Sequence, residues 1–265
     1  MQWKLITFLL LILQLTGEKA LFAQADTVYP GSRHLNTGFL KPGINQYLVF
    51  HQRPQSNKML QFQYWMRDIS IEKKDGVEVF AIREHWFSAD SNEYRTFLSL
   101  GSVKDFTPLY HAATGNGKMA AYNWSKTGIK GSDTVNGNTR KDFHLAFDRP
   151  NFNWHLDIET FEMLPLAAGK TFAINFYDAG LAPPAFVLYN VTGSEVLRTL
   201  DNREVDCWKL VTTGADNKGT PYTQSFWISK KGHELLKEED EYDGRFRYKI
   251  KLPGLTPDIL QKFTL

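Results

Sequence analysis

The sequence predicts a mainly β protein: a curved antiparallel sheet, forming an open half-barrel or flattened barrel, with one short helix near residues 153–164. The strongest observation is alternation, since Phe172, Ile174 and Phe176 are separated by smaller or polar residues, as in a strand with one apolar face. Closely spaced turn signals from Met163 to Leu252 indicate consecutive antiparallel strands. Because a strand covered on both faces would read as an unbroken apolar run, the alternation favours a sheet curved around a single interior.

The N-terminal half of the chain also reads as antiparallel strands. Residues 26–58 are rich in proline and glycine around one short strand at Tyr47–His51, so we expect an irregular arm leading into the sheet. Met59–Lys74 and Val77–Phe87 flank Asp75-Gly76, a pair that favours the type I′ turn of a long hairpin. The other expected elements are strands at Tyr94–Leu100, Leu109–Ala113, Met119–Lys126 and Phe143–Phe147, and an exposed loop at Gly128–Asn138.

One segment, Asn153–Leu164, has a helical pattern. Trp154, Ile158 and Phe161 recur at i, i+4 and i+7, and Pro165 stops the pattern. A single helix laid on or inside a curved sheet is a coherent way to close the core.

The last expected strand has the clearest two-sided pattern and follows the hairpin signal Asp243-Gly244. Its apolar row, expected inside, is Phe246, Tyr248, Ile250 and Leu252, and its basic row, expected outside, is Arg245, Arg247, Lys249 and Lys251. An acidic run at Glu238–Asp243 precedes and includes the turn, so we expect cross-strand pairs of opposite charge on the outer face. A basic patch for lipid headgroups or an anionic glycan is the alternative.

The first 25 residues have the three regions of a secretory signal peptide. Lys4 supplies the positive region, Leu5–Leu15 the apolar region and Ala23-Gln24-Ala25 a cleavage site of small residues. A buried N-terminal helix is the alternative, but it does not explain the three regions together. No later stretch is long and apolar enough to span a membrane, so the mature chain is expected to be exported to the periplasm, or to be extracellular or associated with the outer membrane.

The remaining chain is expected to hold one β domain at 59–252, between the arm at 26–58 and a C-terminal tail at 253–265. No long linker of proline, glycine or serine divides it. Lys and Arg number 31 against 29 Asp and Glu, a balance that gives no electrostatic case for nucleic acid. Cys207 is the one cysteine, which excludes an intramolecular disulfide and, in a strand, favours a buried thiol.

A series of motifs in the C-terminal half is similar to a known family. In order they are Leu164-Pro165-Leu166, Gly169-Lys170, Val191-Thr192-Gly193-Ser194-Glu195-Val196, Cys207-Trp208-Lys209-Leu210, Phe226-Trp227-Ile228-Ser229 and Leu235-Leu236-Lys237. They resemble the secreted bacterial family of domain of unknown function number 3108, over about residues 150–252 and more loosely before that. The resemblance implies a periplasmic, largely antiparallel β fold, similar to the open half-barrels that carry lipoproteins across the periplasm. It carries over no catalytic residues.

One helical stripe is the only local candidate for chemistry. His155, Glu159 and Glu162 fall at i, i+4 and i+7, and an imidazole with two carboxylates could bind a divalent cation or serve acid–base catalysis. The alternative is a solvated polar stripe with an ion pair. No histidine pair has the spacing of a metal motif, and no serine elbow, phosphate loop or dinucleotide motif is present. We therefore expect neither an enzyme nor a cofactor.

The aromatic content favours a ligand-binding interior. Six tryptophans follow the signal peptide: Trp65, Trp86, Trp124, Trp154, Trp208 and Trp227. Core packing explains such enrichment, but so does a half-barrel with an unfilled interior, and exposed coplanar rings would instead suit carbohydrate stacking. The residues expected to line the interior and bind the ligand are Phe62, Tyr64, Phe80, Trp208, Phe226 and Tyr248.

These observations favour a non-enzymatic, exported protein of a bacterial envelope that binds a lipid-like or other apolar ligand in a concave sheet. The first alternative is an envelope interaction or assembly module, with a filled core, a protein partner and an exposed apolar patch or sheet edge. The second is a hydrolase that uses a histidine and carboxylate site.

Overall fold

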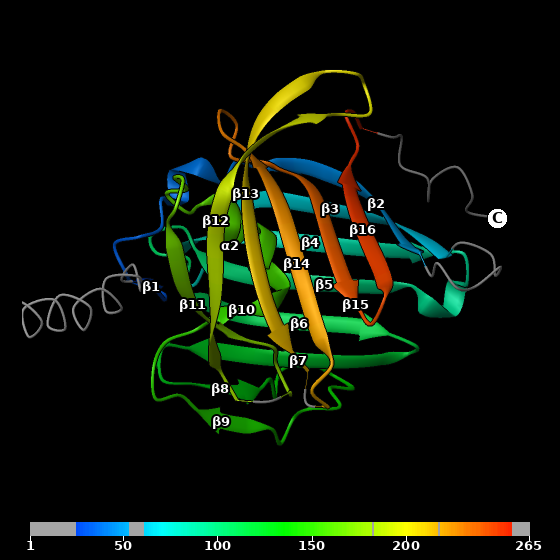
Figure 1. Ribbon diagram of the computed structural model, residues 1–265. Helices are drawn as coiled ribbons and strands as arrows, with labels where there is room; N and C mark the ends of the chain where they lie inside the picture. Colours follow the sequence, from blue (N-terminus) through cyan, green and yellow to red (C-terminus); the bar gives the residue numbers. More distant parts are fainter. Residues whose placement is uncertain (1–24, 53–60, 182, 217, 256–265) are drawn as a thin grey trace, which may run out of the picture.

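The computed structural model describes residues 25–52, 61–181, 183–216 and 218–255, and its strands form one large sheet (Figure 1). In chain order the strands are β1 (Asp26–Val28), β2 (Gly43–Gln52), β3 (Gln61–Lys74), β4 (Val77–Ser88), β5 (Arg95–Ser102), β6 (Pro108–Gly115), β7 (Lys118–Ser125), β8 (Gly128–Gly131), β9 (His144–Ala146), β10 (Phe152–Asn153), β11 (Thr171–Tyr177), β12 (Ala185–Arg198), β13 (Glu204–Ala215), β14 (Pro221–Ser229), β15 (Leu235–Tyr242) and β16 (Arg245–Lys251). The protein is therefore mainly β, as predicted.

The sheet is open, because its spatial order runs from β1 at one edge to β9 at the other: β1-β11-β12-β13-β14-β15-β16-β2-β3-β4-β5-β6-β7-β8-β9. The short strands β1 and β10 pair with β11 in parallel, and the other pairs are antiparallel. Figure 1 shows β12–β15 crossing in front of β3–β7. The curved antiparallel sheet predicted from the sequence is confirmed, and it does not close into a barrel.

The helical segment lies between these two parts of the sheet (Figure 1). It consists of a 3-10 turn, η4 (Trp154–Leu156), and a short α-helix, α2 (Asp157–Glu162). Two further 3-10 turns are η2 (Thr37–Phe39) and η3 (Ser91–Glu93). The short helix predicted near residues 153–164 is thus present, and it is enclosed by the sheet. Among the described residues, none of the helices has the length and apolarity needed to cross a membrane.

The hairpin turns follow their sequence signals. The Asp75-Gly76 turn between β3 and β4 has φ angles of 51° and 79°, and the Asp243-Gly244 turn between β15 and β16 has 51° and 66°. A type I′ turn requires positive φ at both central residues, and Gly, Asn and Asp tolerate this better than most residues. Both hairpins are therefore confirmed.

The N-terminal segment differs from the irregular arm expected at 26–58. Strand β2 lies in the middle of the sheet between β16 and β3, and its Tyr47 and Val49 are fully buried. The loop expected at Gly128–Asn138 also begins with a strand, β8. At Gly131 a Cβ atom would lie 1.9 Å from the backbone oxygen of Arg140, so glycine is needed there for the close approach of two chains.

Three expected features lie partly outside the described residues. They are the signal peptide, of which 1–24 are not described, the end of the arm with the start of the strand expected from residue 59, which fall on 53–60, and residues 256–265 of the tail.

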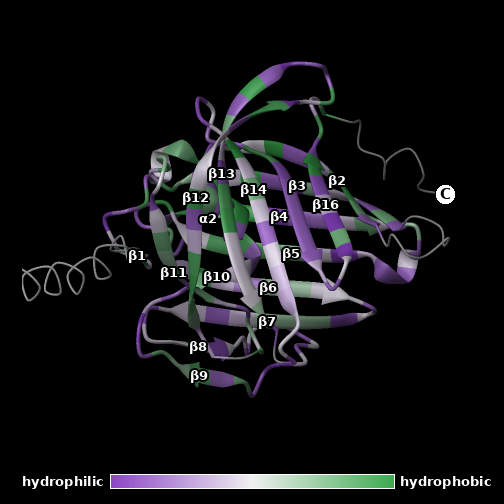
Figure 2. Cartoon of the chain, in the orientation of Figure 1, coloured by the Kyte–Doolittle hydropathy of each residue, from purple (hydrophilic) through white to green (hydrophobic). Residues whose placement is uncertain are grey.

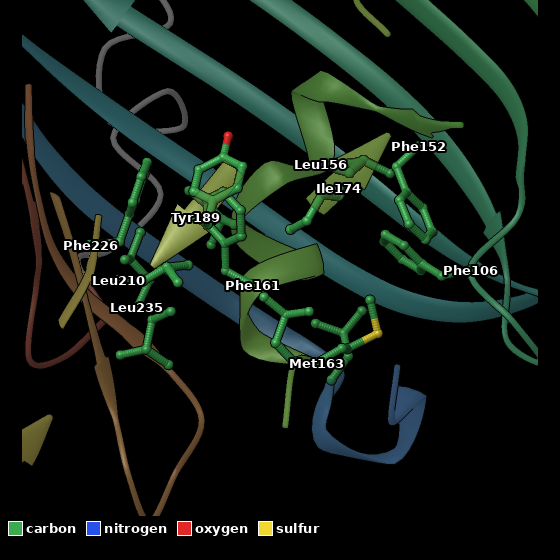
Figure 3. Close-up of a cluster of buried hydrophobic side chains, with 14 of the residues drawn as sticks. Phe106, Phe152, Leu156, Phe161, Met163, Ile174, Tyr189, Leu210, Phe226 and Leu235 are labelled. Carbon is green, nitrogen blue, oxygen red and sulfur yellow. The ribbon is translucent and has the colours of Figure 1, made fainter. Parts of the chain in front are cut away.

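The apolar core surrounds α2 and joins both parts of the sheet (Figure 3). Phe161 packs against Tyr189 of β12 and Phe226 of β14, with ring centroids 4.8 and 4.7 Å apart. Figure 2 shows the alternation of apolar and polar residues along most strands, whereas β15 is largely hydrophilic. The core is thus filled by the helix, and polar side chains enter the interior from β15 and its neighbours.

Candidate functional site

The helical segment begins with a side-chain cap. The side-chain oxygen of Asn153 accepts a hydrogen bond from the backbone N–H of His155 at 3.2 Å, which satisfies a donor at the start of the first turn. Leu156, Ile158 and Phe161 then face the apolar core and are fully buried. Because the sheet wraps around the helix, the polar side chains of α2 also need partners inside the protein.

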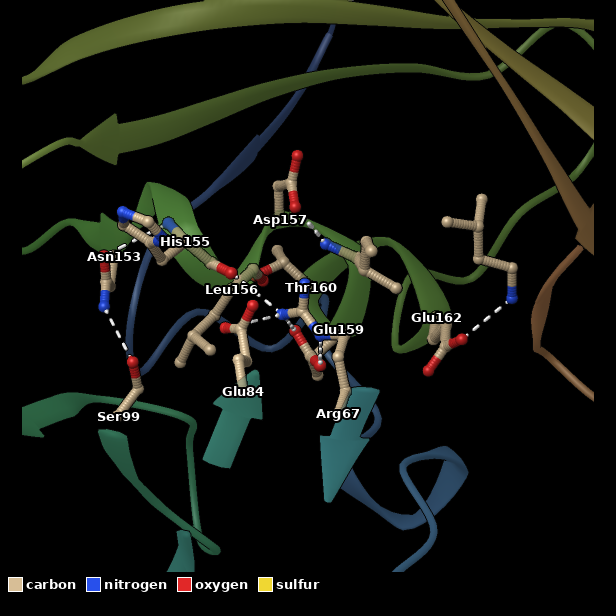
Figure 4. Close-up of polar contacts among 12 residues, drawn as sticks. Arg67, Glu84, Ser99, Asn153, His155, Leu156, Asp157, Glu159, Thr160 and Glu162 are labelled. Carbon is tan, nitrogen blue, oxygen red and sulfur yellow. Dashed lines mark hydrogen bonds and ion pairs between the residues drawn. The ribbon is translucent and has the colours of Figure 1, made fainter. Parts of the chain in front are cut away.

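Arg67 on β3 holds the helix through a buried ion-pair cluster (Figure 4). Its Nε and Nη2 atoms donate to the two carboxylate oxygens of Glu159 at 2.9 and 2.6 Å, and Nη2 also donates to the backbone oxygen of His155 at 2.9 Å. Glu84 on β4 lies 3.3 Å from the same guanidinium. Burial raises the pKa of both carboxyls, although Arg67 opposes that rise. This bidentate contact fixes the orientation of α2.

The predicted stripe of His155, Glu159 and Glu162 does not form one site (Figure 4). Glu159 turns to Arg67, whereas Glu162 accepts a hydrogen bond from the backbone N–H of Leu235 at 2.8 Å. The solvated stripe is wrong, because the sheet encloses α2 and leaves Glu159 only 1% and Glu162 only 6% exposed. Burial raises the pKa of Glu162 to about 8. No group of three or more His, Cys, Asp or Glu side chains in the described parts of the chain is arranged to hold a metal ion.

A second charged cluster joins β15 and β16. Glu238 is 1% exposed and accepts hydrogen bonds from Lys249 and Arg247, and the Nε atom of Arg247 donates to Asp240 at 2.6 Å. Although burial opposes ionisation, Lys249 and Arg247 lower the pKa of Glu238 to about 2. Burial, reinforced by the charge of Glu238, raises the pKa of Asp240 to about 6. The cluster therefore holds carboxyls of very different acidity side by side.

The predicted cross-strand charge pairs are thus present, but on the inner face. Lys249 lies opposite Val49 of β2, which is fully buried, so Arg247 and Lys249 point inward. The apolar row of β16 faces outward instead, where Tyr248 stacks on Phe50 at 4.9 Å. The expected orientation of β16 is wrong, because ion pairs with Glu238 and Asp240 allow the basic row to be buried.

A small pocket lies between the two charged clusters and has a volume of about 180 Å³. It is lined by Trp65, Arg67, Trp86, Trp154, His155, Asp157, Asp178, Gln224, Arg247 and Lys249. Trp65 and Trp86 come from paired strands and stack with ring centroids 3.8 Å apart and an angle of 1° between their planes. The Lys249 ammonium lies 4.8 Å from the centre of the Trp65 ring. We call this cavity the interior pocket.

A buried serine and histidine lie close to the start of the helical segment. The Nδ1 atom of His111 is 2.9 Å from the Ser99 hydroxyl and 3.0 Å from the side-chain nitrogen of Asn153. Burial, together with the charge of His155, lowers the pKa of His111 well below its usual value, so its imidazole is neutral. Ser99 is 0% exposed, so in this conformation its hydroxyl is closed to a substrate. The cluster anchors Asn153 and hence the start of the helix.

The six residues expected to line a ligand-binding interior divide between two faces of the sheet. Phe80 and Phe226 are 1% exposed and belong to the packed core, and Trp208 packs against its edge. Phe62 is 54% exposed, and Tyr64 lies on the same strand face, opposite to buried Trp65.

The interior placement expected for Phe62, Tyr64 and Tyr248 is therefore wrong, because the inward row of β3 contains Trp65, Arg67 and Ile69 instead. Our sequence reasoning missed Arg67, although its place between Trp65 and Ile69 in a period of two could have indicated an inward charge. Whether any of the six residues binds a ligand stays a prediction.

A larger groove of about 530 Å³ lies beneath the β12–β13 hairpin. Figure 1 shows this hairpin curling away from the rest of the sheet above β16. The curl follows a bulge between Val191 and Gly193, where Gly193 has φ of 154°, a conformation that L-residues rarely adopt. Ile250 lies on the outer side of β16, next to inward Lys249, so the groove is separate from the interior. We call it the hairpin groove.

The hairpin groove combines an apolar wall with basic side chains. Its apolar residues are Ile44, Leu197, Leu200, Leu236, Ile250, Leu252, Pro253 and Leu255. Its charged residues are Arg198, Arg203, Lys237, Lys251 and Glu234. The four cations pair with carboxylates, as Lys251 does with Glu234 at 2.8 Å, but these pairs are at least partly exposed to water and contribute little to stability. An incoming anionic group could replace such partners at small cost.

The model of the family described as Protein of unknown function (DUF3108) matches residues 67–251, which is more than half of the chain. The chain belongs to the DUF3108 family. This confirms the resemblance inferred from the C-terminal motifs and extends it through the N-terminal strands β4–β7. No curated protein matches the sequence.

The fold of this DUF3108 protein is also similar to that of a solved structure. A solved structure described as a beta-barrel-like protein of domain of unknown function DUF1849 from Brucella abortus superimposes with a TM-score of 0.53 and 11% sequence identity. The match covers 80% of this chain and 96% of the other. At this identity the likeness shows the fold alone.

Proposed function

We propose that this protein is an exported, non-enzymatic component of a bacterial envelope that binds an amphiphile, with an acyl chain and an anionic head group, in the hairpin groove. The observation that carries the proposal is that one cavity is lined both by apolar residues, among them Leu197, Leu200 and Ile250, and by four basic side chains. A volume of about 530 Å³ lies within the range of roughly 300–1,000 Å³ that is usual for small-molecule sites. The signal-peptide pattern of residues 1–25 supports export.

The sequence predicted that a lipid-like ligand binds in the concave interior, whereas we propose that it binds on the outer side of the sheet. The interior holds α2, its apolar contacts and the two charged clusters, so an acyl chain there would displace well-packed side chains. In the hairpin groove the side chains of Leu200 and Leu255 are 55% and 66% exposed, and an acyl chain would cover them. Burial of each methylene group contributes about 0.8 kcal/mol to binding.

The basic residues of the groove favour a ligand with an anionic head group. Each of Arg198, Arg203, Lys237 and Lys251 pairs with a carboxylate, but only Glu234 among those carboxylates lines the groove. The wall itself therefore presents more cations than anions to a carboxylate or phosphate head group. A neutral ester of the same chain length lacks this attraction.

Displacement of a fluorescent fatty acid from residues 26–265 tests the proposal. We expect Leu197→Asp to weaken binding of the probe by about tenfold or more, because burial of one leucine contributes about 1.5–3 kcal/mol. Val196→Asp is the matched control, since Val196 is 65% exposed on the same strand and outside the groove. Oleate should displace the probe better than methyl oleate. Equal loss in both variants, or equal displacement by both ligands, would contradict the proposal.

A second candidate function is an assembly module of the envelope. It is favoured by the filled interior and by the outer aromatic row of Phe62, Phe50 and Tyr248, which lie side by side on neighbouring strands. Such an exposed apolar surface is typical of a protein contact. If this candidate is correct, Phe62→Asp abolishes capture of the partner from an envelope extract, whereas Leu197→Asp leaves it unchanged.

A further inference from the structure

The interior contains more carboxyl groups than cations. The cations at the interior pocket are Arg67, Arg247 and Lys249. The carboxyls around them are Glu84, Asp157, Glu159, Asp178, Glu238 and Asp240. Even if every cation is neutralised by one carboxylate, three carboxyl groups remain without a counter-charge. Buried charges of one sign are costly, so these groups must hold protons, face a protonated His155, which also lines the pocket, or face a cation from outside the chain.

Asp157 and Asp178 are the two of these carboxyls that form no ion pair with the three cations. Glu84 and Glu159 flank Arg67, and Glu238 and Asp240 hold the two cations of β16. By contrast, neither Asp157 nor Asp178 forms an ion pair within the described residues, and both line the interior pocket. The one hydrogen bond to the Asp157 side chain comes from the neighbouring Ile158 N–H at 2.7 Å. Burial raises the pKa of both carboxyls, although nearby Lys249 opposes that rise at Asp157 and His155, which also lines the pocket, opposes it at Asp178.

The walls of the pocket are aromatic, and one ammonium already lies against them. Lys249 is placed 4.8 Å from the centre of the Trp65 ring, the geometry of a cation–π contact. Trp86 stacks on Trp65 with ring centroids 3.8 Å apart. Trp154, which is only partly buried, adds a third indole to the lining. Indole faces attract organic cations, whereas the described residues offer no cluster suited to a metal ion.

We propose that the interior pocket binds a small organic ammonium, held between the Trp154 indole and the carboxylates of Asp157 and Asp178. The volume of about 180 Å³ suits a free amine or the ammonium end of a larger molecule, such as a lipid head group. Arg247 and Lys249 do not oppose such a ligand strongly, because Glu238 and Asp240 already neutralise them. This site is independent of the hairpin groove, which lies on the other side of the sheet.

Calorimetric titration of residues 26–265 with choline tests the proposal, with 3,3-dimethylbutanol as the neutral ligand of the same shape. We expect choline to bind and dimethylbutanol to bind at least about tenfold more weakly. Affinity for choline should be higher at pH 8 than at pH 5, because protons compete for Asp157, Asp178 and nearby Asp240, whereas the charge of choline does not change. His155, whose pKa is lowered by burial, acts in the same direction, because its imidazole gains positive charge only as pH falls. Absence of choline binding, equal binding of the two ligands, or binding of Ca²⁺ in place of choline would overturn the proposal.

Two variants locate the site. Asp178→Asn and Trp154→Leu should each weaken choline binding by about tenfold, whereas Asp148→Asn, which removes an exposed carboxylate elsewhere, should leave it unchanged. Asp178→Asn removes a carboxyl that forms no ion pair within the described residues, so the variant should fold as stably as the parent in thermal unfolding. Vesicles of phosphatidylcholine distinguish the two sources of the ligand: binding to these vesicles and to free choline indicates a lipid head group, and binding to choline alone indicates a free amine. Equal choline affinity in all three variants would refute the assignment.

Discussion

Replacement of Arg67 by methionine should destabilise the protein strongly, because it leaves two buried carboxyls without their cation. Glu84 is 0% and Glu159 is 1% exposed, and both lie within 3.3 Å of the guanidinium. Removing one partner of a buried ion pair costs about 3–5 kcal/mol. Methionine fills much of the same volume, so the loss reports on the charge and its hydrogen bonds. Urea unfolding followed by tryptophan fluorescence measures this loss in the free energy of unfolding directly.

The loss should depend on pH. Without Arg67 the pKa values of Glu84 and Glu159 rise further above those in the unfolded chain, so the folded variant binds protons more tightly than the unfolded one. A carboxyl with a raised pKa contributes most stability below its unfolded pKa and loses it as pH rises through the folded value. The difference in unfolding free energy between parent and Arg67→Met is therefore expected to be larger at pH 8 than at pH 5.

An exposed ion pair provides the matched control. Arg198 and Glu204 are 3.2 Å apart, with side chains 68% and 65% exposed, so Arg198→Met should cost about 1 kcal/mol or less. Adding Glu84→Gln and Glu159→Gln to Arg67→Met should recover part of the lost stability, since no unpaired charge remains. The reasoning is refuted if Arg67→Met and Arg198→Met cost the same, or if the loss at pH 5 equals that at pH 8.

Three further predictions follow from other parts of the molecule. Glu162→Gln should stabilise the protein at pH 9 but hardly at pH 5. The reason is that the folded pKa of about 8 makes the parent protein lose stability as pH rises from about 4.5 to 8. An equal change in the urea midpoint at pH 5 and pH 9 would contradict this prediction. Gly193→Ala should lower the free energy of unfolding in urea by about 1–3 kcal/mol, because alanine rarely adopts the φ of 154° found there, and it should also weaken fatty-acid binding. Gly254→Ala, the control, should unfold like the parent protein. Expression with the native leader should yield a periplasmic chain that begins at Asp26 by N-terminal sequencing, and retention of residues 1–25 would contradict the signal peptide.

The strands could be predicted because their signals are local. Alternation at Phe172, Ile174 and Phe176 and the turns at Asp75-Gly76 and Asp243-Gly244 depend on neighbouring residues alone, and β11 and both hairpins follow them. The direction in which a face points is not local. For β16 the choice between an apolar and a basic interior depended on Glu238 and Asp240 of the partner strand, because these carboxylates stabilise the buried basic row.

The candidate sites were harder to predict, because they depend on contacts between distant segments. Glu159 and Arg67 are 92 residues apart in the chain, and no periodicity links them. The hairpin groove depends on a single bulge at Gly193, which turns the β12–β13 hairpin over β16. Motifs at Val191–Val196 and Cys207–Leu210 revealed the family, but not that the chain between them bends into a groove.

Native mass spectrometry of residues 26–265, purified gently from a periplasm, tests the proposed function most directly when it is paired with an organic extract of the same sample. We expect a bound mass that partitions into the organic phase, carries an acidic group and is lost in Leu197→Asp but retained in Val196→Asp. A ligand-free mass in the parent protein, or a bound lipid that both variants retain equally, would contradict binding in the hairpin groove.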